Sequence, residues 1–397
     1  MTPYRDQFFL ASCVQRGLLD EPSLADALDR FASSRQRSLV RTLVDSGWIA
    51  VAEFEDFRRR VEEYLATSEE EEFLALYRLA KGLSFPGLRD LKNPRVRRLL
   101  TDFIPRAEPR HRIHTVVSCE DNDYQYWQAE LLAHSFFRSG MTGDLTLLVA
   151  TEGAAPPTHD FSAEVVTTHR ASPHPETGDD YAAYNKPASL LEWFSNHRVD
   201  AEQILILDPD CIFLRPVLSQ SGIGYPRADS VHYMDTTNER GSRLIQKHCR
   251  TGSQYAFPAV IPVLIEADDL RMILPRWLEA TEEIRNDPES RDLAGWVAEM
   301  WGYVIAAAES GLVHLPSRFS AAPMDATTDC PIIHYCFDVD YGEGGYHWGK
   351  RTYAPWSKPE PLPREANGAA RALLEILEEK AARCDYMLLN EPPAVNS

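Results

Sequence analysis

Two carboxylates, Asp208 and Asp210, stand one residue apart and directly follow the apolar run Ile204–Leu207. An apolar run of this length predicts a buried strand, so both side chains lie where that strand ends. Because the alternation of side chains stops there, the two carboxylates can turn toward one hard cation, and Pro209 pre-sets the bend between them. Mg²⁺ or Mn²⁺ held in this way keeps open positions for the oxygens of a diphosphate. We therefore predict a divalent-metal site at Asp208 and Asp210.

The Asp-x-Asp pattern is a weak signal without its context. A chain of this size should show roughly one or two such pairs by chance. This chain contains three: Asp121/Asp123, Asp208/Asp210 and Asp338/Asp340. Only the second pair directly follows an apolar strand, and the alternative for it is a polar strand-end turn without a ligand. A HAD-type phosphatase also begins with a strand and Asp-x-Asp, but the continuation Cys211–Pro216 lacks the Gly and the Thr or Val that usually follow.

Strands and helices alternate along the chain from residue 112 onward. The patterns predict strands at Ile113–Cys119, Leu145–Ala150, Glu164–Thr168 and Ile204–Leu207, and helices at Tyr124–Phe137 and Lys186–Asn196. They continue with a strand at Ala259–Ile265, helices at Ala267–Arg285 and Leu293–Ser310, short strands near Val313–Leu315 and Pro331–Tyr335, and a last helix at Ala366–Ala382. This order predicts an α/β fold with a mostly parallel, doubly wound sheet, in which ligands bind outside the carboxyl ends of the strands. Ser118–Glu120 and Asp208–Asp210 should therefore share one rim.

The N-terminal part of the chain has a different hydrophobic pattern. Its apolar residues recur at helical spacing, and no strand pattern appears before His111. We predict a small all-α accessory domain over residues 1–110, the α/β domain over 111–357, and a linker, helix and tail over 358–397. The accessory domain either docks a protein partner or is a packing extension of the α/β domain.

The composition argues against several classes of partner. The formal net charge is −19, so neither nucleic acid nor an anionic membrane surface is an expected partner. No apolar run reaches the ~18–20 residues that cross a bilayer, and the first residues do not have the form of a secretory signal. Seven cysteines without a CxxC pair suit reduced thiols. We therefore expect a protein of a bacterial-type cytoplasm.

A set of short stretches, in a fixed order, carries a resemblance to a known family. In chain order they are His114–Ser118, Trp127–Gln128, His134–Phe136, Tyr184–Ala188 with Trp193, Ile204–Asp210, Asp268–Leu270, Trp277–Leu278, Thr281–Glu282, Gly295–Tyr303, Ala307–Glu309 and His334–Tyr335. Over roughly 240 residues this order resembles the plant hydroxyproline O-arabinosyltransferases and peptidyl-serine α-galactosyltransferases. The resemblance implies a GT-A fold, which uses a nucleotide-sugar donor, with residues 111–357 as the glycosyltransferase domain.

The resemblance also implies roles for particular residues. Asp208 and Asp210 match the metal-binding pair, and His334 is similar to the third metal ligand of GT-A enzymes. A neutral imidazole is a reasonable ligand for Mn²⁺, although His334 is otherwise read as a hydrogen-bonded strand histidine. Ser118 and Glu120 end the first strand, where GT-A enzymes contact the nucleoside. For Glu120 the alternative is that it caps the helix that follows.

Two lysines are candidates for the positive charge that a diphosphate needs and that the acidic chain otherwise lacks. Lys186 follows Asn185 at a predicted helix start near the rim, and Lys350 ends the Gly-rich loop that begins at Tyr341. We assign Asn185, Lys186 and Lys350 to donor binding. Loops of this kind often close over a diphosphate, and Trp348 is the candidate for the lid. The alternative is that both lysines are simply solvated.

Glu299 is a carboxylate within the apolar segment Trp296–Trp301. A carboxylate in such a segment is costly unless it has a partner, and that cost favours a polar cleft. There Glu299 would bind sugar hydroxyls or position the acceptor hydroxyl, and with Lys186 it is our candidate catalytic residue. Trp296 and Trp301 either stack on sugar or peptide or belong to the core.

These observations predict a metal-dependent glycosyltransferase. It would move a pentose or hexose from a UDP-sugar to a hydroxyl group of a peptide, protein or small molecule, and the resemblance implies a retaining reaction. The alternative is a catalytically inactive GT-A-fold scaffold that binds partners through its N-terminal helices. A nucleotidyltransferase is disfavoured, because no Gly-rich loop with Lys or Arg follows Ile113–Cys119.

Overall fold

The structure is a computed structural model of the 397-residue chain. It describes residues 9–14, 18–32, 40, 43–44, 46–66, 113–153, 161–218, 221–222, 224–326, 329–342 and 345–390. Residues 67–112 lie outside this set, so the predicted domain boundary near residue 110 stays a prediction.

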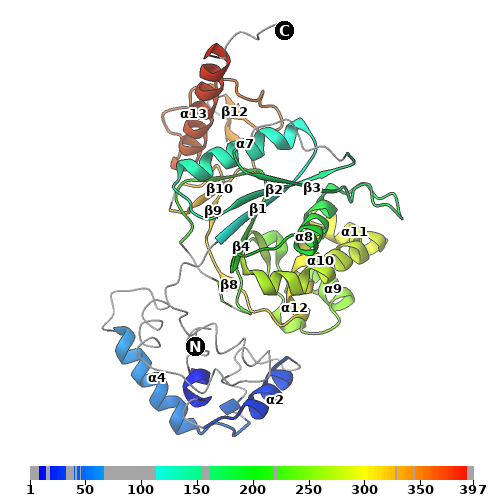
Figure 1. The fold of residues 1–397 in the computed structure, drawn as a ribbon, viewed down its shortest axis with the longest axis vertical. Helices are drawn as coiled ribbons and strands as arrows, with labels where there is room; N and C mark the ends of the chain where they lie inside the picture. Colours follow the sequence, from blue (N-terminus) through cyan, green and yellow to red (C-terminus); the bar gives the residue numbers. More distant parts are fainter. Residues whose placement is uncertain are drawn as a thin grey trace.

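A seven-stranded sheet forms the centre of the fold, with strand order β3-β2-β1-β4-β7-β6-β8 (Figure 1). The strands are β1 Ile113–Glu120, β2 Leu145–Thr151, β3 Glu164–His169, β4 Gln203–Leu207, β6 Arg227–Ser230, β7 Ala259–Glu266 and β8 Leu315–Pro316. Strands β1 to β4 run parallel, but β7 is antiparallel to both β4 and β6. The α/β class and the mostly parallel sheet are both confirmed, because β7 is the one strand of this sheet that runs against the other six. The apolar residues of β7 indicate a strand that is buried on both faces, but they do not reveal the direction in which this strand runs.

Helices cover both faces of this sheet, as expected for a doubly wound fold (Figure 1). The α-helices of this part of the chain are α7 Asp123–Arg138, α8 Asn185–Asn196, α9 Glu239–His248, α10 Ala267–Asn286, α11 Pro288–Ala294, α12 Ala298–Glu309 and α13 Gly368–Asn390. Short 3₁₀ turns lie at Ala182–Tyr184, His232–Met234, Ser253–Tyr255 and Gly295–Val297. Neighbouring residues of β1 point to opposite faces. Val117 belongs to the core cluster that includes Phe136 of α7, whereas Val116 packs in the cluster of Leu190 on α8 and Trp277 on α10.

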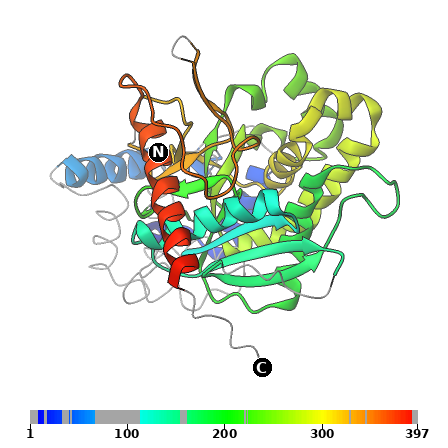
Figure 2. The same ribbon diagram turned by 90° about the horizontal axis from the view of Figure 1, so that it is seen from above.

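A smaller sheet and a hairpin return the end of the chain to the rim of the central sheet. Strand β5 (Cys211–Phe213) follows β4 almost directly and pairs antiparallel with β10 (Ile332–His334), which pairs with β9 (Ser320–Ala321). In this register His334 lies opposite Cys211, beside the Asp208–Asp210 turn. Strands β11 (Val339–Tyr341) and β12 (Tyr346–Trp348) form a hairpin just before Lys350, and α13 packs beside α7 (Figure 2).

The predicted helix Leu293–Ser310 is interrupted at Gly295. The chain instead forms α11, a 3₁₀ turn called η5 (Gly295–Val297), and α12. Gly295 has a φ of 58°, a left-handed conformation that a glycine adopts without steric cost. Because of this break, Trp296 lies on η5 rather than inside a continuous helix, and its direction no longer follows the helical pattern of α12.

Helices α10 and α12 approach closely at Gly302. A Cβ at this position would clash with the Thr281 hydroxyl oxygen and would lie 2.9 Å from the Trp277 carbonyl oxygen and 3.0 Å from the Thr281 amide nitrogen. Alanine would otherwise improve helix propensity by up to about 1 kcal/mol. Overpacking against backbone atoms typically costs about 1–3 kcal/mol and outweighs that gain.

We therefore expect Gly302→Ala to lower the free energy of unfolding by about 1–3 kcal/mol in urea denaturation. The matched control is Gly153→Ala, whose added Cβ would meet only the Thr151 hydroxyl oxygen at an ordinary 3.6 Å. That substitution should change stability by no more than about 0.5 kcal/mol. Equal stability of the two variants would contradict the close approach of α10 and α12.

The described N-terminal residues include two helices with their own core, α2 (Glu21–Ala32) and α4 (Val51–Ala66). Leu24, Leu43 and Phe54 belong to this core, and Leu315 at the start of β8 packs against it. The predicted N-terminal helices are therefore confirmed where the structure describes them. Among the described helices none is long and apolar enough to cross a membrane.

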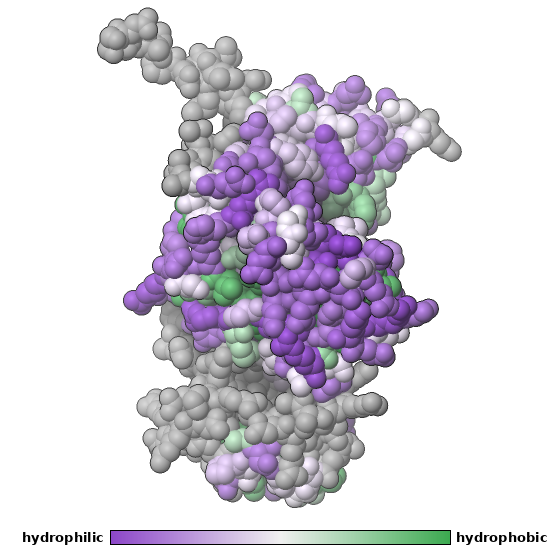
Figure 3. Space-filling model, turned by 90° about the vertical axis from the view of Figure 1, so that its right-hand side faces the viewer, coloured by the Kyte–Doolittle hydropathy of each residue, from purple (hydrophilic) through white to green (hydrophobic). Residues whose placement is uncertain are grey.

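The surface on the side of α9 and α11 is mainly hydrophilic, with apolar residues in small separate patches (Figure 3). Ion pairs link these two helices. Lys247 lies 2.6 Å from Asp287 and 3.1 Å from Glu289, and Arg243 also pairs with Glu289. Because these side chains are substantially exposed, each pair contributes little to stability.

Candidate active site

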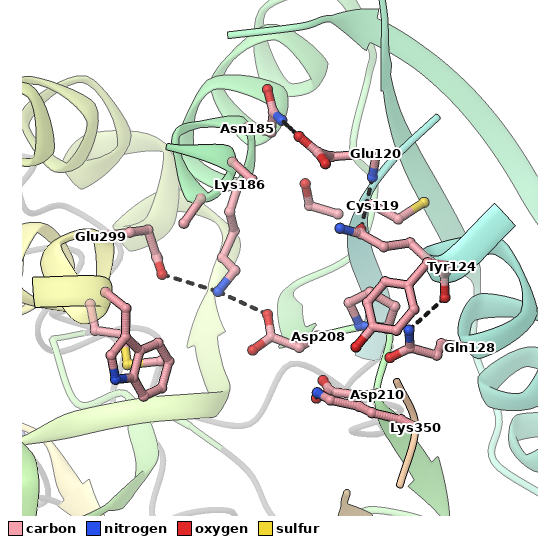
Figure 4. Close-up of a pocket in the computed structure, with 17 residues that line it drawn as sticks. Cys119, Glu120, Tyr124, Gln128, Asn185, Lys186, Asp208, Asp210, Glu299 and Lys350 are labelled. Atoms are coloured by element: carbon pink, nitrogen blue, oxygen red, sulfur yellow. Dashed lines mark hydrogen bonds and ion pairs between the residues drawn. The ribbon is translucent and has the colours of Figure 1, made fainter. Parts of the chain in front are cut away.

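A pocket of about 240 Å³ lies at the carboxyl ends of β1 and β4, where a doubly wound sheet binds its ligands. Side chains from β1, the starts of α7 and α8, the β4–β5 turn and α12 line it (Figure 4). The sequence-predicted residues that it brings together are Ser118, Glu120, Asn185, Lys186, Asp208, Asp210, Glu299 and Lys350. His334 does not line the pocket, but it contacts the carboxylates from below the rim in β10.

The imidazole of His334 lies within 4 Å of both carboxylates. The Nε2 atom of His334 lies 3.2 Å from Oδ1 of Asp210 and 3.9 Å from Oδ2 of Asp208. Burial alone would lower the pKa of His334, but the nearby carboxylates, chiefly Asp210, outweigh it and raise the pKa. A divalent cation at this point would replace the proton of His334 as the partner of both carboxylates.

Cys211 is a further group near this point, because its sulfur lies close to the ligand atoms of Asp210 and His334. A cysteine ligates metals as a thiolate. Burial raises the pKa of Cys211 well above its ordinary value, and the charges of Asp210 and Asp208 raise it further. The thiol therefore stays protonated, and Asp208 is the better third ligand on chemical grounds.

Asp210 is the most strongly held carboxylate of the site. Its side chain is buried and forms ion pairs with Nζ of Lys350 and with His334. Burial alone would raise the pKa of Asp210, but His334 and Lys350 together hold it well below its ordinary value. Asp210 is therefore ionised at neutral pH, as a metal ligand must be.

Lys186 bridges the other carboxylates of the pocket. Its Nζ atom lies 2.8 Å from Oδ1 of Asp208 and 3.1 Å from Oε2 of Glu299 (Figure 4). Burial disfavours the charged ammonium, but Asp208 and Glu299 outweigh it and raise the pKa of Lys186. Burial raises the pKa of Glu299, and the Lys186 ammonium opposes that rise. The buried Glu299 therefore has a charged partner in the structure, and that partner is Lys186.

Glu120 is tied to the start of α8 at the opposite end of the pocket. The side-chain amide of Asn185 donates a hydrogen bond of 2.8 Å to Oε1 of Glu120, and Asn122 donates one of 3.3 Å to Oε2. Arg170, which follows β3, lies 3.8 Å from the same carboxylate. Sequence reasoning missed Arg170, although the rule that selected Ser118 and Glu120 at a strand end applies equally to β3.

Sequence reasoning also missed Tyr124 and Gln128, which line the pocket from the start of α7. Tyr124 is 40% exposed at the start of this helix. The signal that was available is position, because the first turn of a helix that follows β1 must face the carboxyl end of that strand.

The structure does not bring Trp348 into the pocket. The indole is buried in β12, with ring centroids 6.1 Å from Tyr335 and 5.7 Å from Tyr353. It belongs to the core under α13, so the predicted role as a lid is not supported. The two other tryptophans that the sequence analysis considered for ligand stacking differ in burial. Trp301 is fully buried, whereas Trp296 is 69% exposed and lines the pocket.

Curated plant enzymes are similar to this chain. A peptidyl serine alpha-galactosyltransferase of Arabidopsis thaliana is 30% identical over 254 residues, which cover 59% of this chain but only 31% of that protein. Hydroxyproline O-arabinosyltransferase 3 of Arabidopsis thaliana is 25% identical over 296 residues, covering 67% of this chain and 78% of that enzyme. Hydroxyproline O-arabinosyltransferase RDN2 of Medicago truncatula is 24% identical over 287 residues, covering 67% and 78%. These plant relatives conflict with the expected bacterial origin.

Among solved structures, the galactosyltransferase LgtC in complex with donor and acceptor sugar analogues matches with a TM-score of 0.40 at 15% identity, covering 67% of this chain and 95% of that chain. The family model described as "Hydroxyproline O-arabinosyltransferase family N-terminal domain" matches residues 113–315. These residues make up just over half of the chain and contain six of the seven strands of the central sheet together with the first residue of β8. The chain therefore belongs to the hydroxyproline O-arabinosyltransferase family.

Proposed function

We propose that this protein is a metal-dependent glycosyltransferase that moves a sugar from a UDP-sugar to a hydroxyl group of a peptide. The observation that carries the proposal is the convergence of Asp208, Asp210 and His334 at the carboxyl end of β4, with an ammonium group on each carboxylate. Family membership supports the reaction class, because the similar plant proteins are named as glycosyltransferases.

The donor set suits Mg²⁺ or Mn²⁺. Two carboxylates and one imidazole are hard and borderline ligands, and the imidazole of His334 lies within 4 Å of each carboxylate at the closest atoms. Asp208, Asp210 and His334 would hold the ion. When bound, it neutralises negative charge on the leaving diphosphate.

The residues around this point have separate tasks in the proposed reaction. Lys350 and Lys186 bring positive charge to the diphosphate, which the acidic chain would otherwise repel. Ser118, Glu120 and Asn185 contact the nucleoside at the end of β1. Because these groups are fixed by hydrogen bonds and ion pairs before the donor arrives, little reorganisation is needed in the transition state.

The names of the relatives point to a hydroxyproline or a serine hydroxyl, and we propose a peptide hydroxyl of this kind. Glu299 is our candidate for orienting the sugar or acceptor hydroxyls from the floor of the pocket. We propose that the reaction retains the anomeric configuration of the sugar, which NMR of the product would test. A cytoplasmic location and a partner for the N-terminal helices stay predictions from the sequence.

Calorimetry with UDP in the presence and absence of Mn²⁺ tests the proposal directly. We expect UDP to bind measurably with Mn²⁺ and at least tenfold more weakly after chelation, which corresponds to about 1.4 kcal/mol. Slow hydrolysis of a UDP-sugar that requires Mn²⁺ would support an active enzyme. Binding of neither UDP nor any UDP-sugar would instead favour the inactive scaffold.

A further inference from the structure

The pocket has two differently built sides, with Asp208 between them (Figure 4). The side of β1 and α7 carries Glu120, Tyr124 and Gln128, which are polar or amphipathic. The side of η5 and α12 carries Glu299 together with the apolar surfaces of Trp296 and Met300. In the proposed function the nucleoside lies on the first side. The second side is therefore left for the group that receives the sugar.

Trp296 is the most exposed aromatic residue of this second side. Its side chain is 69% exposed, whereas Met300 beside it is buried. An indole has the largest apolar surface of any side chain, so a ligand that covers it buries a large apolar area. The ring of Tyr233 lies 6.0 Å away at 46°, so the two rings form an open angled surface.

The backbone beneath Trp296 is held by a chain of fixed contacts. The Tyr181 hydroxyl donates a hydrogen bond of 2.7 Å to the Trp296 carbonyl and accepts one of 3.0 Å from the Glu299 amide. The Arg285 guanidinium lies 4.4 Å from the centre of the Tyr181 ring. Asp179 in turn holds Arg285 through two hydrogen bonds of 2.7 and 2.8 Å. The backbone that carries the exposed indole is therefore held at a fixed place relative to the backbone of Glu299.

We propose that Trp296 and Tyr233 form an acceptor platform that binds the apolar C–H face of a saturated ring carrying the accepting hydroxyl. This inference rests on the proposed function, because it assigns the second side of the same pocket. A saturated ring presents weakly positive C–H groups, which are attracted to the negative face of an indole. The ring is either the pyrrolidine of a hydroxylated prolyl residue or the ring of a glycoside, and both present the same C–H face.

The platform also explains how the site would choose among hydroxyl groups. A serine hydroxyl sits on a short flexible side chain, which covers little of an indole surface. A hydroxyl on a ring is presented in a fixed direction when the opposite face of the ring stacks on Trp296. Stacking therefore positions the nucleophilic oxygen toward Glu299 and the sugar donor, at a small entropic cost. Trp296 is thus a positioning residue that determines acceptor specificity.

Ligand-observed NMR with Mg²⁺ and UDP present tests the platform with three probes. Two are synthetic peptides that differ only in a central 4-hydroxyproline or serine between alanines, and the third is methyl galactoside. We expect Trp296→Ala to weaken binding of at least one ring-containing probe about tenfold, or ~1.4 kcal/mol. Trp296→Phe should keep most of the affinity, and binding of the serine peptide should change less than about twofold. Whichever ring probe responds identifies the source of the ring.

Controls separate this inference from the proposed function. Calorimetry of UDP with Mn²⁺ should give the same affinity for wild type and Trp296→Ala, since Trp296 lies on the acceptor side. Phe137→Ala removes an aromatic side chain of α7 that is 55% exposed, and it should leave the affinity for all three probes unchanged. The platform is wrong if wild type binds no ring probe, if Trp296→Ala binds the ring probes normally, or if it loses the serine peptide equally. Loss of UDP binding in wild type would instead overturn the proposed function.

Discussion

The Asp210→Asn protein is expected to lose Mn²⁺-dependent affinity for UDP by about 100-fold or more. Substituting residues that merely orient metal ligands typically costs about 10–100-fold, so removing a ligand charge should reach the upper end of that range. Asp210 is the point on which His334 and Lys350 both converge, and its side chain is buried. Asparagine keeps the shape of the side chain but removes the charge that a divalent cation requires.

The chain supplies its own control for this experiment. Asp340 belongs to another Asp-x-Asp pair, but its side chain on β11 is 60% exposed and lies outside the pocket lining. Asp340→Asn removes the same charge from the same acidic protein and should leave UDP affinity within about twofold, because exposed charges are screened. Calorimetry on both variants, after thermal melts confirm that they are folded, compares them. Equal UDP affinity for Asp210→Asn and wild type would remove Asp210 from the metal site.

Much of this site followed from one rule about strand ends. Apolar runs located β1 and β4, and the carboxyl-end rule placed Ser118, Glu120 and Asp208 on a common rim. The structure brings these residues together because β1 and β4 are hydrogen-bonded neighbours. Local pattern was enough here, since each residue lies within three positions of a strand that the sequence marks clearly.

Contacts between distant short elements were beyond such reasoning. The position of His334 depends on the pairing of the three-residue strands β5 and β10, and no local pattern specifies that register. The ion pair between Lys350 and Asp210 depends on the same return of the chain. Trp348 is a different case. In the hairpin Tyr346 and Trp348 are buried and His347 is exposed, an alternation that already favoured a strand over a lid.

Lys186→Met is the second substitution with a large expected effect. It removes the ammonium that lies between Asp208 and Glu299 and leaves both carboxylates without it in a buried site. Removing one partner of a buried ion pair typically costs about 3–5 kcal/mol, and we expect a loss of that size in the free energy of unfolding. We also expect loss of Mn²⁺-dependent binding of UDP, because Asp208 loses its fixed position and the diphosphate loses a cation.

A double variant separates these two effects. Adding Glu299→Gln to Lys186→Met removes the unpaired charge of Glu299 while keeping its shape, so we expect urea denaturation to show recovery of at least half of the lost stability. Mn²⁺-dependent binding of UDP, which lacks the sugar that Glu299 is proposed to orient, should stay at the level of Lys186→Met in the same double variant, since restoring the fold does not return the cation. Recovery of stability and binding together would mean that Lys186 only compensates the charge of Glu299. Recovery of stability alone is the result expected if Lys186 acts on the donor. In that case donor binding still needs the charge of Lys186 after the stability of the fold has been restored.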